Sequence, residues 1–326
     1  MGEVDAKRSR FVRGRGVLAW IAFLIAAVAL VARYMPVANH TVLIIGALSP
    51  YLMSGTAVAA VLLLLDRRWW SAALALLLLA AAVIVEAPQY LRSGQPPEDS
   101  TPIRVLTANL YHGTADPESI ATAAREHADL LLVQELSPHL ALTLSENYLR
   151  SDFPYEVLRP GNYGAGVGIW SRYPIVQSSA ITKFALGAIT ATVRPPGAAD
   201  VIVASVHIAG PWPQSVDKWR EEIAALPGVL ERLAAAAGSG AAIVAGDLNA
   251  TADLKPFRRL LDTGFRDGSP PFRFAATYPA NMPVPPLIRI DHILTYNSTA
   301  TGAYTVRIAG SDHRALGAKV YVPNSR

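Results

Sequence analysis

Three runs without a charged side chain occupy the first quarter of this 326-residue chain, at residues 17–32, 41–65 and 69–85. A helix that crosses a lipid bilayer needs about 20 consecutive apolar residues, and about 17 is the lower limit. The second run is long enough by itself, with a kink expected at Pro50, and the other two approach full length with their flanking residues. The sequence therefore predicts three transmembrane helices, at about 17–35, 41–65 and 69–85.

A cleaved signal peptide is the alternative interpretation of the first run, because a basic segment precedes it. No small-x-small cleavage pattern stands out before Arg33, and two further apolar runs follow. These observations favour a retained helix, although the sequence alone leaves both interpretations open.

The basic residues predict the orientation of these helices. Residues 1–16 hold five basic side chains, and Arg67 and Arg68 lie between the second and third runs, on the same side if each run crosses once. Basic loops stay in the cytoplasm. We therefore expect a multi-pass protein of the cell membrane with a cytoplasmic tail at 1–16, contact with the lipid bilayer through 17–85, and the rest of the chain on the outer face.

The remainder of the chain begins with a tether. Residues 86–101 are rich in proline, glycine and polar side chains, which indicates a short linker before a domain at 102–322. Residues 93–326 hold 20 basic and 21 acidic side chains, so this part carries −1 although the whole chain carries +4. Bulk attraction to long polyanions is therefore weakly supported. The absence of cysteine excludes disulfides, thiolate zinc sites, iron–sulfur clusters and cysteine nucleophiles.

Short β-branched runs alternate with helical stretches from residue 103 onward. Strands are predicted near residues 103–110, 129–135, 167–208, 241–249, 287–296 and 315–322. A long helical region is predicted at 214–237, interrupted at Pro227-Gly228. This pattern predicts a layered α/β domain with many antiparallel strands.

Several apolar strands end in a carboxylate, an amide or an imidazole. Such polar groups do not contribute to the packing of an apolar core. These side chains are Asn109, Glu135, His207, Asp247, Asn249, Asp291, His292, Asp312 and His313. If packed sheets deliver these strand ends to one edge, the polar groups converge on one cleft.

The chemistry of this set indicates one kind of substrate. Carboxylates without thiols are hard oxygen ligands that favour Mg²⁺ or Mn²⁺ and the phosphate oxygens that these ions bridge. Amides donate hydrogen bonds to developing negative charge, and imidazoles stabilise or protonate it. Taken singly, each residue also has a structural explanation, such as an Asx turn for Asn109 or a core histidine for His207. The combination predicts metal-assisted cleavage of a phosphoester.

Six segments carry a resemblance to a known family. In chain order they are VLTANLYHG, LLLVQELSP, VASVHIAGP, VAGDLNA, RIDHILT and GSDHRAL. Together they resemble the endonuclease/exonuclease/phosphatase (DNase I-like) superfamily, here in a membrane-anchored bacterial form. The resemblance covers about 102–322 and implies a four-layer α/β sandwich, in which two mainly antiparallel sheets are flanked by helices, preceded by the three transmembrane helices.

The resemblance also implies a role for each matched residue. The divalent cation, Mg²⁺ or Mn²⁺, would be bound by Asn109, Glu135 and Asp312. Asp247 would orient or deprotonate the attacking water, and Asn249 would contact the phosphate.

The histidines complete the implied site. His313 would be held by Asp291 and act on the phosphate or the departing oxygen. His207 matches a second histidine of DNase-like and sphingomyelinase-like members, whereas the role of His292 stays open.

The sequence thus predicts a hydrolase of phosphoester bonds. Phosphodiesters of nucleic acid or of a lipid headgroup are the preferred substrates. A phosphomonoesterase acting on a lipid or small phosphorylated molecule is the alternative, and a catalytically inactive, membrane-anchored binding module is a further one. No protein partner is predicted, and the number of metal ions and the oligomeric state stay open.

Overall fold

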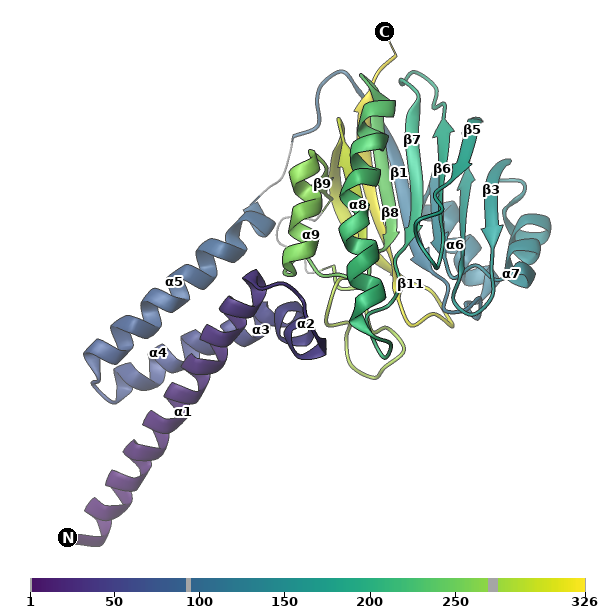
Figure 1. Ribbon diagram of the computed structural model, residues 1–326. Coiled ribbons are helices and arrows are strands. Elements are labelled where there is room, and N and C mark those ends of the chain that lie inside the picture. The colour runs from purple at the N-terminus through teal and green to yellow at the C-terminus, as the bar shows by residue number, and fades with distance from the viewer. Residues whose placement is uncertain (1, 92–94, 269–274, 326) are drawn as a thin grey trace. The chain divides into compact units, whose positions relative to one another are not determined.

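The computed structural model describes residues 2–91, 95–268 and 275–325. It divides into two compact units (Figure 1). One unit consists of Met1–Leu91 with Ala252–Lys255, and the other holds Arg92–Thr251 and Pro256–Arg326. Residues 2–91 form helices only, whereas all strands of the described chain belong to the second unit.

Five helices form the N-terminal part: α1 (Gly2–Tyr34), α2 (His40–Ala47), α3 (Ser49–Met53), α4 (Gly55–Leu65) and α5 (Trp69–Leu91). Two stretches are long and apolar enough to cross a membrane, Arg13–Tyr34 and Trp69–Pro88. The middle run is bent by 65° between His40–Ala47 and Ser49–Leu65, and counts as a third span only if the bent pair crosses as one. The bend lies beside Pro50, where a proline lacks the N–H that a continuous helix would need.

Small side chains form the contacts among these helices. Ala19 of α1, Ala59 and Ala60 of α4, and Ala72 and Ala75 of α5 are buried in one cluster. Alanine lets two helix backbones approach closely, which is how helices pack where no water drives their association.

The helix boundaries differ from the predicted segments at two places. Residues of the predicted tail 1–16 continue the helix of α1, and α5 extends through Pro88 to Leu91, beyond the predicted end at residue 85. Pro88 removes one backbone donor near the end of α5 without ending the helix. Because β1 already begins at Ser100, the connection is shorter than the predicted linker 86–101.

Twelve strands of the described chain form two six-stranded sheets. The first has the order β11 (Thr299–Arg307), β12 (Arg314–Pro323), β1 (Ser100–Asn109), β2 (Leu130–Gln134), β4 (Gly166–Ser171), β3 (Tyr155–Pro160). The second has the order β5 (Ile175–Ala180), β6 (Ala188–Val193), β7 (Val201–His207), β8 (Ala241–Asp247), β10 (Asp291–Tyr296), β9 (Arg266–Asp267). The central pairs β1/β2 and β7/β8 are parallel and the other pairs are antiparallel.

The two sheets pack face to face over a shared apolar core. Ile103 and Leu132 of the first sheet and Val203 and Ile243 of the second are fully buried in one cluster. On its other face, the first sheet is covered by α6 (Pro117–His127) and α7 (Pro138–Thr143). Helix α8 (Val216–Ala237) lies against β7 and β8, and α9 (Lys255–Leu260) follows it (Figure 1). The predicted four-layer α/β sandwich is confirmed.

Helix α8 corrects one detail of the prediction. It runs unbroken from Val216 to Ala237, although a break was expected at Pro227-Gly228. Trp219, Leu226 and Leu230 are buried along the face that packs on the sheet. This packing offsets the one hydrogen bond that a proline removes from a helix interior.

Candidate active site

Strand register brings three of the predicted residues into one row. His207 ends β7 opposite Asp247, which ends the neighbouring parallel strand β8. On the other side of β8, Asp291 begins β10 opposite the same Asp247. Because residues paired across neighbouring strands point to the same face, these three side chains lie side by side.

A close approach of two strands explains the glycine before Asp247. Gly246 has a φ of +151°, and a Cβ at this position would lie 1.9 Å from the carbonyl oxygen of Val206. Only glycine fits such a contact. Asn249 follows in the left-handed region, at a φ of +47°, and its backbone N–H donates to Oδ1 of Asp247 at 2.8 Å.

The first sheet delivers the facing side chains. Asn109 ends β1 opposite Gln134 of β2, and Glu135 follows with a φ of +58°. Nδ2 of Asn109 donates to Oε1 of Glu135 and to Oδ2 of Asp247, at 3.1 Å each. Asn109 therefore links the carboxylates of the two sheets.

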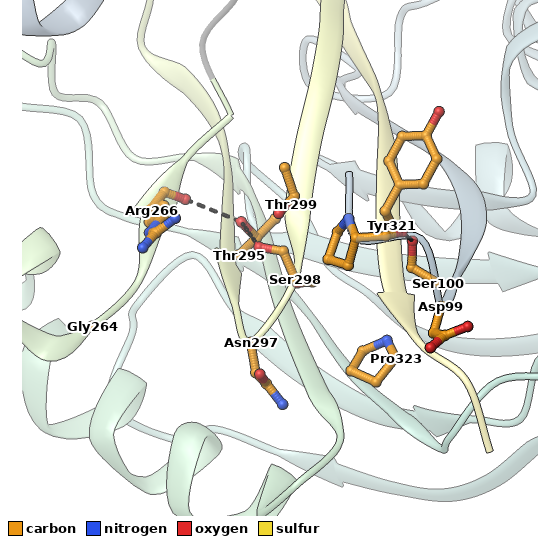
Figure 2. A pocket seen from close by; sticks show the side chains of 11 residues that line it. Asp99, Ser100, Gly264, Arg266, Thr295, Asn297, Ser298, Thr299, Tyr321 and Pro323 are labelled. Atoms are coloured by element: carbon orange, nitrogen blue, oxygen red, sulfur yellow. Dashed lines mark hydrogen bonds between the residues drawn. The ribbon is translucent and has the colours of Figure 1, made fainter. Parts of the chain in front are cut away.

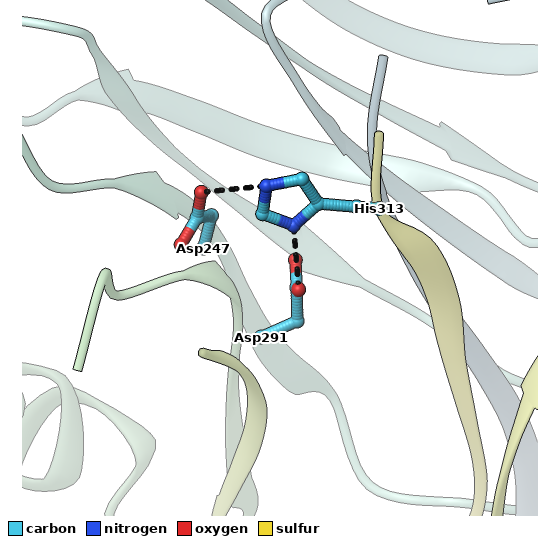
Figure 3. Close-up of side chains that lie close together, drawn as sticks. All are labelled: Asp247, Asp291 and His313. Carbon is cyan, nitrogen blue, oxygen red and sulfur yellow. Dashed lines mark hydrogen bonds and ion pairs between the residues drawn. The ribbon is translucent and has the colours of Figure 1, made fainter. Parts of the chain in front are cut away.

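His313 lies between two carboxylates of the second sheet (Figure 3). Its Nδ1 is 2.8 Å from Oδ2 of Asp291, and its Nε2 is 3.8 Å from Oδ2 of Asp247. The hydroxyl of Ser311 accepts from the backbone N–H of His313 and donates to the carbonyl of Asn109. These bonds fix the ring of His313 at the end of β1.

Burial and charge shift the pKa values of this group. Burial lowers the pKa of His313, but Asp291 and Asp247 raise it more, to about 10. Burial raises the pKa of Asp247 to about 7, against the opposing charge of His313. For Asp291, burial raises the pKa, and the charge and hydrogen bond of His313 outweigh this and lower it below 3.8. At neutral pH the pair is therefore an imidazolium held by a carboxylate.

His207 differs from His313 in its charge. Burial lowers the pKa of His207 to about 4, and the nearby Glu135 only partly offsets this. Its Nε2 lies 3.6 Å from Oδ2 of Asp247 and 3.9 Å from Oε1 of Glu135. A neutral ring that can donate one hydrogen bond thus faces the same space as the two carboxylates.

The donors around Glu135 suit a hard cation. Asp312 lies near Glu135, and burial raises its pKa, with the charges of Glu135 and Asp291 adding to this against that of His313. Its Oδ1 is buried and has no hydrogen-bond partner among the described residues. An unpaired, buried carboxylate oxygen beside a second carboxylate and an amide is the donor set that Mg²⁺ or Mn²⁺ takes.

A second grouping could also hold a metal ion. One ligand atom from each of Asp247, Asp291 and His313 lies within 4.8 Å of the others. In this grouping, Nδ1 of His313 already lies 2.8 Å from Oδ2 of Asp291, so these two side chains are bonded to each other. Oδ1 of Asp312, by contrast, has no hydrogen-bond partner in the described part of the chain.

The last two predicted residues lie in different surroundings. Asn249 donates from Nδ2 to the carbonyl of Ile208 at 2.9 Å, and within residues 2–91, 95–268 and 275–325 nothing accepts its second amide hydrogen. His292 points away from the row, because neighbouring residues of a strand face opposite sides. Its Nε2 lies 2.8 Å from the carbonyl of Ala250, Nδ1 lies 3.2 Å from Asp267, and the ring packs on Phe257. His292 thus supports the loop after Asn249 from behind.

Two residues near the site were not predicted from the sequence. The ring of Tyr278 lies 5.0 Å from the ring of His313, and the backbone N–H of His112 donates to Oε2 of Glu135 at 2.6 Å. Neither follows a strand directly. The one signal for Tyr278 is the uncharged, proline-rich stretch 278–287 that it opens.

A hollow of about 330 Å³ lies elsewhere in the sandwich (Figure 2). Ser100, Asn297 and Pro323 line it, at the start of β1, directly after β10 and at the last residue of β12. Since Asp291 begins β10 and Asn109 ends β1, this hollow is at the opposite end of the strands from the row of polar residues.

Comparison with known proteins gives one family match and several solved structures of similar fold. The model of the Endonuclease/Exonuclease/phosphatase family matches residues 106–313. No curated protein sequence matches the chain significantly. Among solved structures, a chain described as endonuclease/exonuclease/phosphatase from Beutenbergia cavernae has 18% identity and a TM-score of 0.51, covering 68% of this chain and 72% of its own.

Two further solved structures are matched by this chain over almost their whole length. TDP2 of D. rerio, complexed with a single-strand DNA product, has 16% identity and a TM-score of 0.53, with 68% of this chain and 99% of its own covered. A family protein from Bacteroides thetaiotaomicron has 15% identity and a TM-score of 0.54, with coverages of 69% and 99%. At these identities the structural likeness concerns the fold.

Proposed function

Because the chain belongs to the Endonuclease/Exonuclease/phosphatase family, whose members hydrolyse phosphoester bonds, we propose that it is a membrane-anchored, divalent-metal-dependent phosphodiesterase. Its substrate is the phosphodiester of a nucleic acid or of a lipid headgroup. A phosphomonoesterase activity is the alternative that the experiment below separates.

One observation carries the proposal. Asp247 lies between His207 and Asp291 in the register of the second sheet, and it is linked across the sheets to Glu135 through Asn109. Structural carboxylates are rarely buried together without a cation or a proton to compensate them. A phosphate-cleaving site needs this combination of bases, cation ligands and donors.

A bound Mg²⁺ or Mn²⁺ would supply positive charge beside the phosphate oxygens, and Asn109, Glu135 and Asp312 would hold it. The chain's own groups do the remaining work. Asp247, with a pKa raised to about 7 by burial, accepts the proton of the attacking water. The free amide hydrogen of Asn249 and the neutral ring of His207 donate to oxygens that gain negative charge.

His313 completes the reaction as a cation. Asp291 orients its ring through Nδ1 and keeps it protonated, so Nε2 carries a proton toward the site. This proton stabilises the phosphate or is transferred to the departing oxygen. The pairing of a buried carboxylate with a histidine fixes the ring and its protonation state.

The anchor and its side of the membrane are part of the proposal. Arg13–Tyr34 and Trp69–Pro88 are the candidate spans, and the bent pair His40–Leu65 is the third. With the basic residues 1–16 in the cytoplasm and three crossings, the catalytic domain lies on the outer face. Protease treatment of intact cells tests this, since only an outer domain is digested.

The catalytic test uses the full chain in detergent with Mg²⁺ and a soluble chromogenic diester. We expect Asp247→Ala and His313→Ala each to lower kcat by about 100-fold or more, since each removes a proton-transfer group. Asp217→Ala is the matched control, because this carboxylate is 76% exposed at the start of α8 and should leave the rate unchanged. Retention of a tenth of the parent rate in both variants would contradict the assignment.

Substrate class is decided by the product. Release of one alcohol and a phosphomonoester from the diester supports the proposal. Release of inorganic phosphate from a chromogenic phosphomonoester, with the diester left intact, supports the phosphomonoesterase. Circular dichroism of both variants establishes that the domain is folded.

A further inference from the structure

Three loops lie against residues of the candidate active site, and we call them the mouth loops: residues 161–165, 208–215 and 278–287. Each comes close to one site residue. A Cβ on Gly164 would lie 3.5 Å from Oε2 of Glu135. The carbonyl of Ile208 accepts from Asn249, and the N–H of Ala280 donates to the carbonyl of Asp312 at 2.6 Å. The mouth loops therefore form the approach to the phosphate site.

None of the mouth loops contains a charged residue. Their sequences are GNYGA, IAGPWPQS and YPANMPVPPL. Several of their exposed side chains are large and apolar: Tyr163 is 97% exposed, Trp212 65%, Met282 59% and Val284 47%. The polar side chains exposed beside them, such as Gln214 and Asn281, are uncharged. Large apolar side chains gathered on a soluble surface mark a place where another apolar surface binds.

This composition is unsuited to nucleic acid. A protein that binds a DNA or RNA strand neutralises several backbone phosphates with lysine and arginine, and these supply most of its affinity. The mouth loops offer no such side chain, and residues 93–326 as a whole carry −1. Aromatic rings could stack on bases, but the aliphatic Met282 and Val284 have no counterpart in that mode of binding.

The same composition suits the surface of a lipid bilayer. Tryptophan and tyrosine favour the headgroup region, and aliphatic side chains favour the acyl boundary beneath it. The candidate membrane spans on the same chain hold the domain near a bilayer, where such a surface has a constant partner. Resting on the function proposed above, we propose that the mouth loops dip into the bilayer interface and that the substrate is the phosphodiester of a phospholipid headgroup.

The first test measures depth in the membrane and does not require activity. The chain has no cysteine, so Met282→Cys and Val176→Cys each give one site for a nitroxide label. Val176 is the control, since it is 46% exposed on β5, near the strand ends remote from His207. In full-length protein reconstituted into phosphatidylcholine vesicles, we expect the label at 282 to be accessible to oxygen and shielded from a water-soluble nickel complex. A label at 282 as exposed to nickel as the label at 176 would overturn the inference.

The second test compares substrates. For the full chain in mixed micelles, we measure kcat/KM for phosphatidylcholine and for a soluble diester, and take their ratio. Val284→Ser should lower this ratio by about threefold, and Met282→Ser with Val284→Ser by about tenfold, because a buried apolar side chain contributes to binding. Val176→Ser, the matched surface substitution, should leave the ratio unchanged.

The outcomes separate the two proposals. Hydrolysis of plasmid DNA with a water-exposed label at 282 would overturn the lipid inference and keep the phosphodiesterase. An embedded label without hydrolysis of any diester would support the interfacial surface and refute the proposed catalysis.

Discussion

Replacement of Asp291 by asparagine removes the negative charge 2.8 Å from Nδ1 of His313 and keeps the size of the side chain. The pKa of His313 rises from 6.5 to about 10 although burial lowers it, because three carboxylates raise it together. Asp291 contributes most, followed by Asp247 and Asp312. Loss of an opposite charge this close to an ionisable group shifts its pKa by about 1 to 3 pH units.

The sign of the effect follows from the charge. A histidine whose pKa is raised stays protonated until the pH approaches the raised value, and loss of Asp291 brings this loss of the proton to lower pH. We therefore expect the alkaline limb of kcat/KM in D291N to move down by about 1 pH unit or more. The assay follows hydrolysis of the soluble diester by the full chain from neutral to alkaline pH.

Two variants make this measurement decisive. His313→Gln should abolish the alkaline limb together with most of the activity, since no ring is left to titrate. Asp217→Asn removes an exposed carboxylate and should leave the limb in place. If the limb of D291N stays within roughly 0.3 pH unit of the parent, the reasoning that Asp291 maintains the cation is refuted.

Three further predictions concern the cation, a buried carboxylate and a glycine. Binding of Mn²⁺, measured by calorimetry, should weaken as the pH falls into the acid range, because burial raises the pKa of the proposed ligand Asp312 and protons then compete with the cation for its carboxylate. Glu222→Ala should lower the free energy of unfolding by about 2 to 4 kcal/mol, since the buried carboxylate of Glu222 accepts two backbone N–H groups at 2.8 Å each. Glu221→Ala is the control in the same denaturation experiment, because the side chain of Glu221 is 72% exposed. Gly246→Ala should lower the free energy of unfolding by about 2 to 5 kcal/mol, because a Cβ would lie 1.9 Å from the carbonyl oxygen of Val206. An unchanged midpoint of denaturation would contradict this.

Much of the fold could be predicted from local patterns. Apolar runs that end in Asp247, His207 and Glu135 identify buried strands and the edge at which they end. The apolar N-terminal runs predict helices for the same reason, since composition alone decides them. Helix ends could not be predicted from proline positions. Pro88 and Pro227 both lie inside helices, where packing or helix length offsets the hydrogen bond that each proline removes.

The arrangement of the site could not be predicted from local patterns. In the second sheet β8 pairs with β10, and β7 with β8, so Asp247 has neighbours 40 residues before it and 44 after it. Such pairings depend on long-range packing that no sequence window contains. The orientation of His292 could not be predicted either. Asp291 and His292 are neighbours in a strand and face opposite sides, but which of them faces the site depends on where the other sheet packs. Tyr278 lies in a loop without periodicity and gave no signal of its contact with His313.

The register of β7, β8 and β10 makes the alignment of the site residues independent of the loops proposed to contact the substrate. The row of His207, Asp247 and Asp291 is fixed by backbone pairing inside the sandwich, whereas the mouth loops lie on connections outside it. Insertions or substitutions in those connections can therefore accumulate while the cleavage machinery keeps its alignment. Sequence changes in a few surface loops could therefore alter which phosphoester binds, while the row of His207, Asp247 and Asp291 stays as it is.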